Sequence, residues 1–129
     1  MSGLKKDIEN RADIELLMEA FYGVLLSDAS ISYIFTDVAK MNMEKHLPVI
    51  VDFWEMVLFQ KGGYQKNVMA IHQRLNEQSP FTREHFQTWL GYFNQTVDEL
   101  FDGDNARNAK QRALSIATMM QIKMNVAQH

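Results

Sequence analysis

The stretch Asn67-Val68-Met69-Ala70-Ile71-His72-Gln73-Arg74-Leu75 places one histidine among apolar residues at helical spacing. The residues that recur at i, i+3, i+4 and i+7 on one helix face are Val68, Ile71, His72 and Leu75. The imidazole of His72 is therefore expected to point with buried side chains rather than towards water. Two interpretations remain open at this point: a core histidine whose ring nitrogens are both hydrogen-bonded, or a metal ligand.

The size and composition of the chain predict a single domain. The sequence has 129 residues, of which 47% are hydrophobic, with only two prolines and six glycines and no repeat or low-complexity segment. We expect one compact domain over residues 1–129, with the polar residues 1–11 as a loose N-terminal extension.

Charge and cysteine content exclude several classes of function. Thirteen basic and sixteen acidic residues give a net charge of -3, with no basic cluster typical of nucleic-acid or anionic-membrane binding. The absence of cysteine excludes disulfides, thiolate metal sites and thiolate-bound iron–sulfur clusters. No signal peptide is evident, and the most apolar stretch, 47–59, is too short to span a bilayer and is broken by Asp52 and Glu55. We therefore expect a soluble cytoplasmic protein, a monomer by default.

Apolar periodicity predicts helices along the whole chain and strands nowhere, so the predicted fold class is all-α. Pro48 is expected in a first turn, which would start the regular part of its helix near His46. Thr82 is the expected N-cap of a later helix, with Phe81 and Phe86 placed to form a hydrophobic staple across its start. The expected helices cover about 12–26, one or two turns within 31–38, 43–59, a short helix around His72, 82–101 and 105–124.

Two further polar residues fall at or near predicted buried faces. Tyr22 shares the apolar face of the first helix, so its hydroxyl needs a partner, for which a backbone carbonyl or the surface would suffice. His46 lies one turn before Ile50 and either shares the buried face of its helix or is exposed near the helix start. His85, in a first turn, is expected to be exposed.

The possible chemistries are narrowed by what is missing. A zinc or di-iron site needs several converging ligands, yet the Glu-x-x-His repeat of di-iron bundles and the His-Glu-x-x-His motif are both absent. No nucleophile elbow or phosphate-binding glycine loop is present. One internal histidine among aromatic and methionine residues fits a cofactor that carries its own metal and needs one axial ligand, which is haem.

An ordered set of motifs carries a family resemblance over about 14–124. These are Phe21-Tyr22, Phe35 thirteen residues after that tyrosine, His46 followed by Ile50 and Asp52-Phe53-Trp54, Ala70-Ile71-His72-x-x-Leu75, Pro80-Phe81, and His85-Phe86-x-x-Trp89-Leu90. In this combination the chain resembles the truncated haemoglobins of group III. Gly62-Gly63 departs from that pattern and is similar to a glycine pair of the other groups, so the group assignment rests on Tyr22, His46 and Trp89 together.

The resemblance implies a fold, a cofactor and a set of site residues. The implied fold is a truncated globin, a two-on-two helical sandwich around haem b. His72 would be the proximal iron ligand, and Phe35 would pack on the porphyrin. The implied far side of the pocket consists of Tyr22, His46, Ile50 and Trp89. Tyr22 and Trp89 would donate hydrogen bonds to a diatomic ligand that carries partial negative charge.

Some roles stay open within the resemblance. His46 would donate to the ligand, swing out to open a path, or bind the iron itself. Trp54 is expected to back the pocket, Lys66 and Arg74 are candidate partners of the haem propionates, and His129 has no argued role.

The functional hypothesis is a haem protein that binds oxygen and other diatomic gases, including nitric oxide and carbon monoxide. If the protein also catalysed nitric oxide dioxygenation or peroxide reduction, it would be an enzyme. Turnover would then need a reductase supplied by a separate partner, because the sequence has no motif for binding one. The competing hypothesis is a haem-free helical interaction or sensor module whose aromatic face is simply its core.

Overall fold

The computed structural model describes residues 5–34, 43–60 and 82–123. Every regular element in these ranges is helical, which confirms the all-α prediction. The helices are α1 (Arg11–Leu26), α2 (Ala29–Tyr33), α3 (Met43–Phe59), α5 (Arg83–Leu100) and α6 (Asp104–Lys123).

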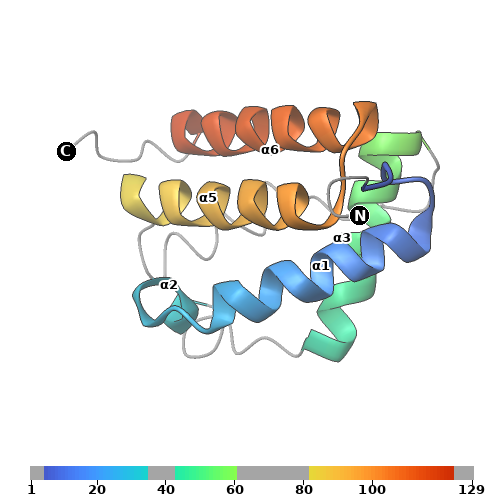
Figure 1. Cartoon of the computed structure of the whole chain (residues 1–129). Coiled ribbons are helices and arrows are strands. Elements are labelled where there is room, and N and C mark those ends of the chain that lie inside the picture. The colour runs from blue at the N-terminus through green and yellow to red at the C-terminus, as the bar shows by residue number, and fades with distance from the viewer. Residues whose placement is uncertain (1–4, 35–42, 61–81, 124–129) are drawn as a thin grey trace.

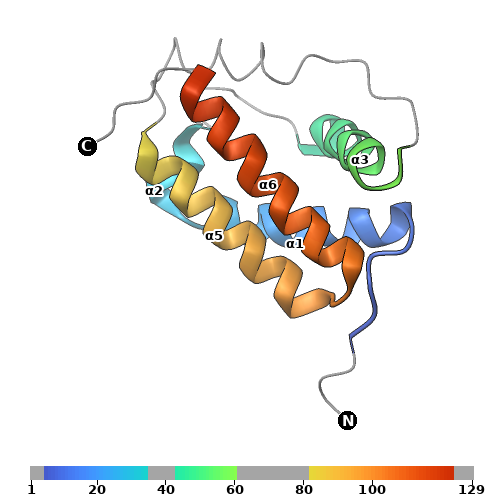
Figure 2. The ribbon, with the colours of Figure 1, turned by 90° about the horizontal axis from the view of Figure 1, so that it is seen from above.

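The long helices are arranged as two packed pairs. α1 packs against α3, and α5 runs antiparallel to α6 after a short connection, as Figure 1 shows. The pairs meet where α1 contacts α5 and α3 contacts α6, and Figure 2, in which α3 is seen nearly end-on, shows that its axis runs in a different direction from α5 and α6. The predicted two-on-two arrangement of helices is therefore present.

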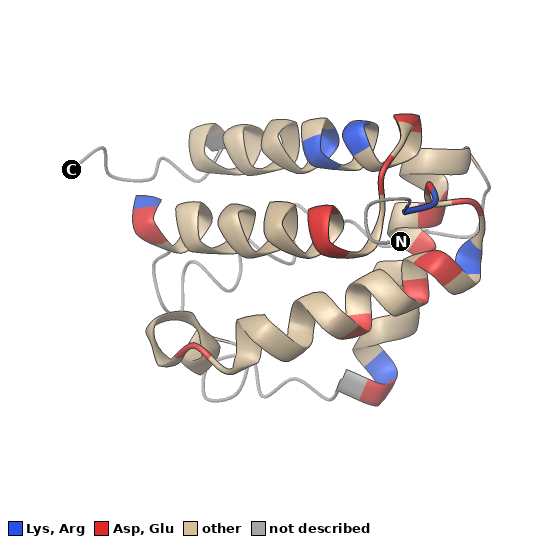
Figure 3. Ribbon diagram, viewed as in Figure 1, with Lys and Arg blue, Asp and Glu red and all other residues tan. Residues whose placement is uncertain are grey.

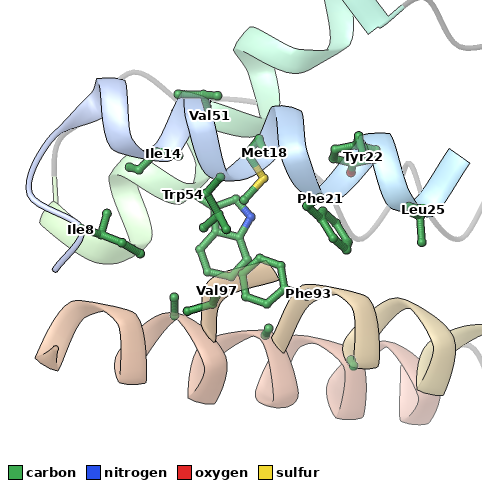
Figure 4. Close-up of a cluster of buried hydrophobic side chains, with 14 of the residues drawn as sticks. Ile8, Ile14, Met18, Phe21, Tyr22, Leu25, Val51, Trp54, Phe93 and Val97 are labelled. Atoms are coloured by element: carbon green, nitrogen blue, oxygen red, sulfur yellow. The ribbon is translucent and has the colours of Figure 1, made fainter. Parts of the chain in front are cut away.

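One face of α1 supplies more buried apolar side chains to the shared core than any other described helix. Its apolar residues recur at helical spacing, so they form a continuous stripe that faces both α3 and α5. Figure 4 shows this stripe beside Val51 and Trp54 of α3 and Phe93 and Val97 of α5. The α1 side chains that are at most 1% exposed are Ile14, Leu17, Met18, Phe21 and Leu25.

The expected loose extension over residues 1–11 is wrong for the part that the structure describes. Ile8 is fully buried, and the Asp7 carboxylate accepts hydrogen bonds from the backbone N–H groups of Asn105 and Ala106, both at 2.9 Å. These groups lack partners within α6 because they lie in its first turn. Gly103 precedes this turn at φ 146°, where a side chain would collide with Asp7. The segment is thus anchored by capping another helix.

Charged residues gather around the same anchored segment (Figure 3). Lys6 Nζ lies 2.7 Å from the carboxylate of Asp13, and Arg11 forms ion pairs with Asp52 and Glu55 of α3. Burial by itself would raise the pKa of Asp13, but its hydrogen bonds to Lys6 and to backbone N–H groups hold the pKa below its usual value. The start of α1 is in this way tied to α3.

The helix α3 begins earlier than its proline suggested. Pro48 lies inside the helix, which starts at Met43 and not near His46. Pro48 lacks the N–H that would reach the carbonyl of residue 44, so this turn lacks one helical hydrogen bond, and the proline side chain is exposed. His46 consequently lies in the first turn of α3.

In the described ranges, no helix has both the length and the apolar composition needed to cross a bilayer.

Replacing Asp7 with Ala should lower the free energy of unfolding by about 1–2 kcal/mol, because two N-terminal N–H groups of α6 lose their acceptor. Urea unfolding would measure the change. Asp102→Ala is the matched control, because the side chain of Asp102 is exposed. Asp102 contacts this segment only through its backbone N–H, which donates to the Lys6 carbonyl and is kept in the variant. Equal stability of the two variants would contradict the capping role.

Candidate functional site

The described part of the structure contains four of the six predicted site residues. Tyr22 lies on α1, His46 and Ile50 lie on α3, and Trp89 lies on α5. The predicted roles of Phe35 and His72 concern residues outside the described ranges. The same is true of Lys66, Arg74, His129, the Gly62-Gly63 pair and Phe81 of the expected staple.

Tyr22 is a buried donor, as its helical position predicted. The residue is only 9% exposed, and its ring stands edge-on to the ring of Phe21, with centroids 5.0 Å apart. Burial raises the pKa of the Tyr22 hydroxyl far above its usual value, because the phenolate would be desolvated. Tyr22 therefore keeps its proton, and its O–H can donate a hydrogen bond throughout the physiological pH range.

His46 lies beside Tyr22 across the contact between α3 and α1. The two rings are perpendicular, with centroids 6.3 Å apart. His46 is half-buried in the first turn of α3, which lies between the two predicted alternatives. Ile50, one turn further along α3, is also half-buried and shares this side of the helix. A titratable imidazole, a phenol and an aliphatic side chain thus meet at one helix pair.

Trp89 is held by aromatic neighbours. Its indole stacks on Phe93, with centroids 5.6 Å apart and planes 11° apart, and Phe21 meets it edge-on at 5.7 Å. Trp54 of α3 stacks on Phe93 and is only 4% exposed, so it belongs to the buried core. Since Phe21 adjoins both Tyr22 and Trp89, the two predicted donors share one buried neighbour.

The helices α3 and α5, which carry three of the four described site residues, have many half-buried apolar side chains packed against the core. Soluble proteins usually bury such residues fully or scatter them singly over the surface. A broad, flat and mostly apolar cofactor with a polar centre would suit this combination of apolar walls and a few donors. The half-buried members on α3 and α5 are Leu47, Ile50, Phe53, Val57, Leu58, Phe59, Trp89, Leu90, Tyr92 and Leu100.

His85 is not exposed as predicted but half-buried at the start of α5. Its Nδ1 accepts a hydrogen bond from the backbone N–H of Thr82 at 3.0 Å, while Thr82 Oγ1 accepts one from the His85 N–H at 3.2 Å. This reciprocal pair is a capping box with histidine in the place of the usual Glu or Gln. The predicted N-cap, Thr82, is confirmed.

Side-chain hydrogen bonds that the sequence did not reveal join α2 to α5. The Tyr33 hydroxyl lies 3.1 Å from His85 Nε2, and the Tyr92 hydroxyl donates to Asp28 at 2.7 Å. Asp28 is also the N-cap of α2, where its side chain accepts a hydrogen bond from the Ser30 N–H. Both ends of the short α2 are thereby fixed against the helix that carries Trp89.

Within the ranges that the structure describes, no three His, Asp or Glu residues gather in a metal-binding arrangement. The polar groups described above are better suited to hydrogen bonding with a ligand than to forming a complete metal coordination shell.

Comparison with known proteins gives a consistent result. No protein-family model matches the chain. The chain is 28% identical over 121 residues to a group 3 truncated haemoglobin of Campylobacter jejuni, and the match covers 92% of this chain and 93% of that protein. The crystal structure of a group III truncated haemoglobin from Campylobacter jejuni superimposes with a TM-score of 0.82 at 26% identity, covering 94% of this chain and 95% of that one. The predicted resemblance is confirmed in sequence and in fold, and the fold is that of a truncated globin.

Replacing His85 with Gln should remove one source of pH-dependent stability while keeping the capping box. Burial lowers the pKa of His85, against the opposing effects of Glu84 and the Ser30 backbone. The folded state therefore binds fewer protons than the unfolded state, so this contribution is present above about pH 6.5 and is lost as the pH falls below it.

The measurement is the urea midpoint of wild type and His85→Gln at pH 8 and pH 5. The advantage of wild type over the variant should shrink at the lower pH, because protonated Nδ1 cannot accept from Thr82. The other histidines are common to both proteins, so the difference isolates His85. Parallel pH profiles would contradict this role.

Proposed function

We propose that this chain, which resembles group III truncated haemoglobins throughout its fold, is a haem-binding globin that binds oxygen and other diatomic gases. One observation carries the proposal: Tyr22, a buried phenol, lies beside the half-buried ring of His46 between α1 and α3, with ring centroids 6.3 Å apart. A ligand that gains negative charge on binding needs a donor of this kind.

The proposed haem b would be held by residues from several parts of the chain. His72 is the proposed axial ligand, Phe35 is proposed to pack on the porphyrin, and Ile50 adds an aliphatic contact from α3. The bound haem would supply an iron centre that takes up a diatomic ligand. The half-buried apolar side chains of α3 and α5 would complete their burial against the flat cofactor and exclude water from it.

Donors from three helices would then face the ligand. The Tyr22 O–H and the Trp89 Nε1–H come from α1 and α5, and neither group can lose its proton under physiological conditions. His46 is proposed to donate as well, or to swing outwards and open a path for the ligand. Its position in the first turn of α3 and its partial exposure support the second role, because a side chain there can reach solvent without crossing the core.

Two permanent donors favour slow release of oxygen over rapid delivery. We therefore propose chemistry on the bound ligand, either nitric oxide dioxygenation or peroxide reduction, with electrons supplied by a separate reductase. We also propose that the protein works as a monomer in the cytoplasm. The competing hypothesis of a haem-free helical module is an outcome of the first experiment below.

The visible absorption spectrum of the purified protein, reduced with and without carbon monoxide, tests the cofactor. We expect an intense haem band that shifts with carbon monoxide, and its loss or marked alteration in His72→Ala. His46→Ala is the matched control and should retain the band, because His46 is proposed to lie on the opposite side of the iron. A colourless wild type that also refuses added haemin would favour the haem-free module.

Replacing Tyr22 with Phe should speed oxygen dissociation about tenfold, since a hydrogen bond worth about 1.4 kcal/mol is lost. Stopped-flow displacement of oxygen by carbon monoxide would measure the rate. Tyr92→Phe is the matched control, because it makes the same chemical change at a hydroxyl that donates to Asp28 and not to the proposed ligand. It should leave the oxygen dissociation rate unchanged. An unchanged rate in Tyr22→Phe would contradict its role as a donor.

A further inference from the structure

Phe93 forms the middle of a stack of three aromatic rings. It lies on α5 one turn after Trp89 and is fully buried. Its ring is nearly parallel to Trp89, at 5.6 Å and 11°, and to Trp54 of α3, at 5.0 Å and 19°. Figure 4 shows Trp54 reaching between α1 and α5 towards Phe93. Two helices therefore contribute to one continuous stack.

A fourth ring limits movement of the stack from the side. Phe21 of α1 stands edge-on to both Phe93 and Trp89, with interplanar angles of 87° and 83° and centroids 5.3 and 5.7 Å away. Stacked and edge-on contacts at these distances are the favourable geometries for aromatic pairs. Trp89 is thus contacted on its face by one phenylalanine and edge-on by another.

This arrangement restricts the rotation that would redirect the Trp89 N–H. The second side-chain torsion of tryptophan is broad when the ring is unconstrained. Rotation about that torsion tilts the indole away from its nearly parallel alignment with Phe93, which breaks the stack and moves the ring edge towards a fully buried neighbour. The position of Phe93 is fixed in turn by its second stacking contact, with Trp54.

We propose that Phe93 is a positioning residue, which fixes the orientation of the Trp89 indole and hence the direction in which Nε1–H donates to the ligand. This role rests on the proposed function, in which Trp89 is a distal donor. Phe93 itself touches neither ligand nor cofactor in this proposal and acts only through Trp89.

A purely packing role for Phe93 makes a different prediction. Phe93→Leu keeps most of the apolar volume but removes the flat ring, so some stability is lost in either case. Only if Phe93 positions Trp89 should Phe93→Leu also change the hydrogen bond that Trp89 donates to the ligand. Val97→Ala is the matched control, because Val97 is fully buried one turn further along α5 but has no ring to stack. Urea unfolding of both variants compares their losses of stability.

The main measurements use the carbon monoxide and oxygen complexes of the whole protein. In Phe93→Leu the infrared C–O stretching band should broaden or split as the donor takes several orientations. Oxygen dissociation should become about twofold to tenfold faster, the range expected for one net hydrogen bond. Val97→Ala should leave both the band and the rate unchanged.

A double-mutant cycle shows whether the effect passes through Trp89. Trp89→Phe removes the donor, so adding Phe93→Leu to that variant should cause no further change in the oxygen rate. An equal effect of Phe93→Leu in both backgrounds would overturn the proposal, as would an unchanged rate in Trp89→Phe alone. Wild-type bands and rates in Phe93→Leu would overturn it as well.

Near-ultraviolet circular dichroism separates failure of this inference from failure of the proposed function. The chain has two tryptophans, Trp54 and Trp89, and both stack on Phe93. Their signal should change in Phe93→Leu and persist in Val97→Ala whether or not the purified protein contains haem. If the protein is colourless and its tryptophan signal changes in Phe93→Leu but not in Val97→Ala, the haem function is contradicted. The contact by which Phe93 orients Trp89 is then still supported. A haem protein whose tryptophan signal is unaffected by Phe93→Leu would contradict the positioning role alone.

Discussion

The structure depends on the burial of a single face of α1. That face carries the residues that α3 and α5 pack against, and at its centre Phe21 is 1% exposed and contacts Tyr22, Trp89 and Phe93. Because Phe21 and Tyr22 are adjacent in sequence, their side chains leave the helix about 100° apart, so one can fill the core while the other reaches towards His46 on α3. The hydrophobic packing that holds the helices together therefore also determines where the polar group of the candidate site can lie.

Polar contacts at the helix ends restrict the sliding of helices along one another, which apolar packing alone permits. Apolar packing tolerates sliding of one helix along another, whereas a capping hydrogen bond has a preferred distance and direction. Asp7 caps α6, the Thr82–His85 pair caps α5, and the hydroxyl of Tyr92 reaches the capping residue of α2. These contacts set the axial position of each helix, and with it the depth at which Trp89 meets the core.

Periodicity in the sequence was sufficient to predict the four long described helices, because each one buries apolar residues at helical spacing. It placed the short α2 too late, within 31–38 rather than at Ala29–Tyr33, because α2 buries only Ile31 and begins at the Asp28 cap. It also predicted the buried position of Tyr22, since a polar residue that falls at the spacing of the apolar residues lies on the same buried helix face. The anchoring of Asp7 was not predictable, because its partners lie about a hundred positions away and a single acidic residue gives no sign of them. His85 was misjudged for a related reason: histidine is unusual at the third position of a helix, and its contact with Tyr33 depends on the tertiary fold. The roles of Phe35 and His72 rest on spacing and resemblance and stay predictions.

The proposed donors lie on separate helices, and this has a physical consequence. Tyr22, His46 and Trp89 come from α1, α3 and α5, so a shift of any one helix changes the relative geometry of the donors. A single hydrogen bond is worth only about 1 kcal/mol net, and small displacements weaken it. The aromatic contacts around Phe21 and Phe93 resist such shifts because they join all three helices through closely packed, inflexible rings. A rigid core of this kind would hold the three proposed donors in a constant relative arrangement, which the proposed binding of a diatomic ligand requires.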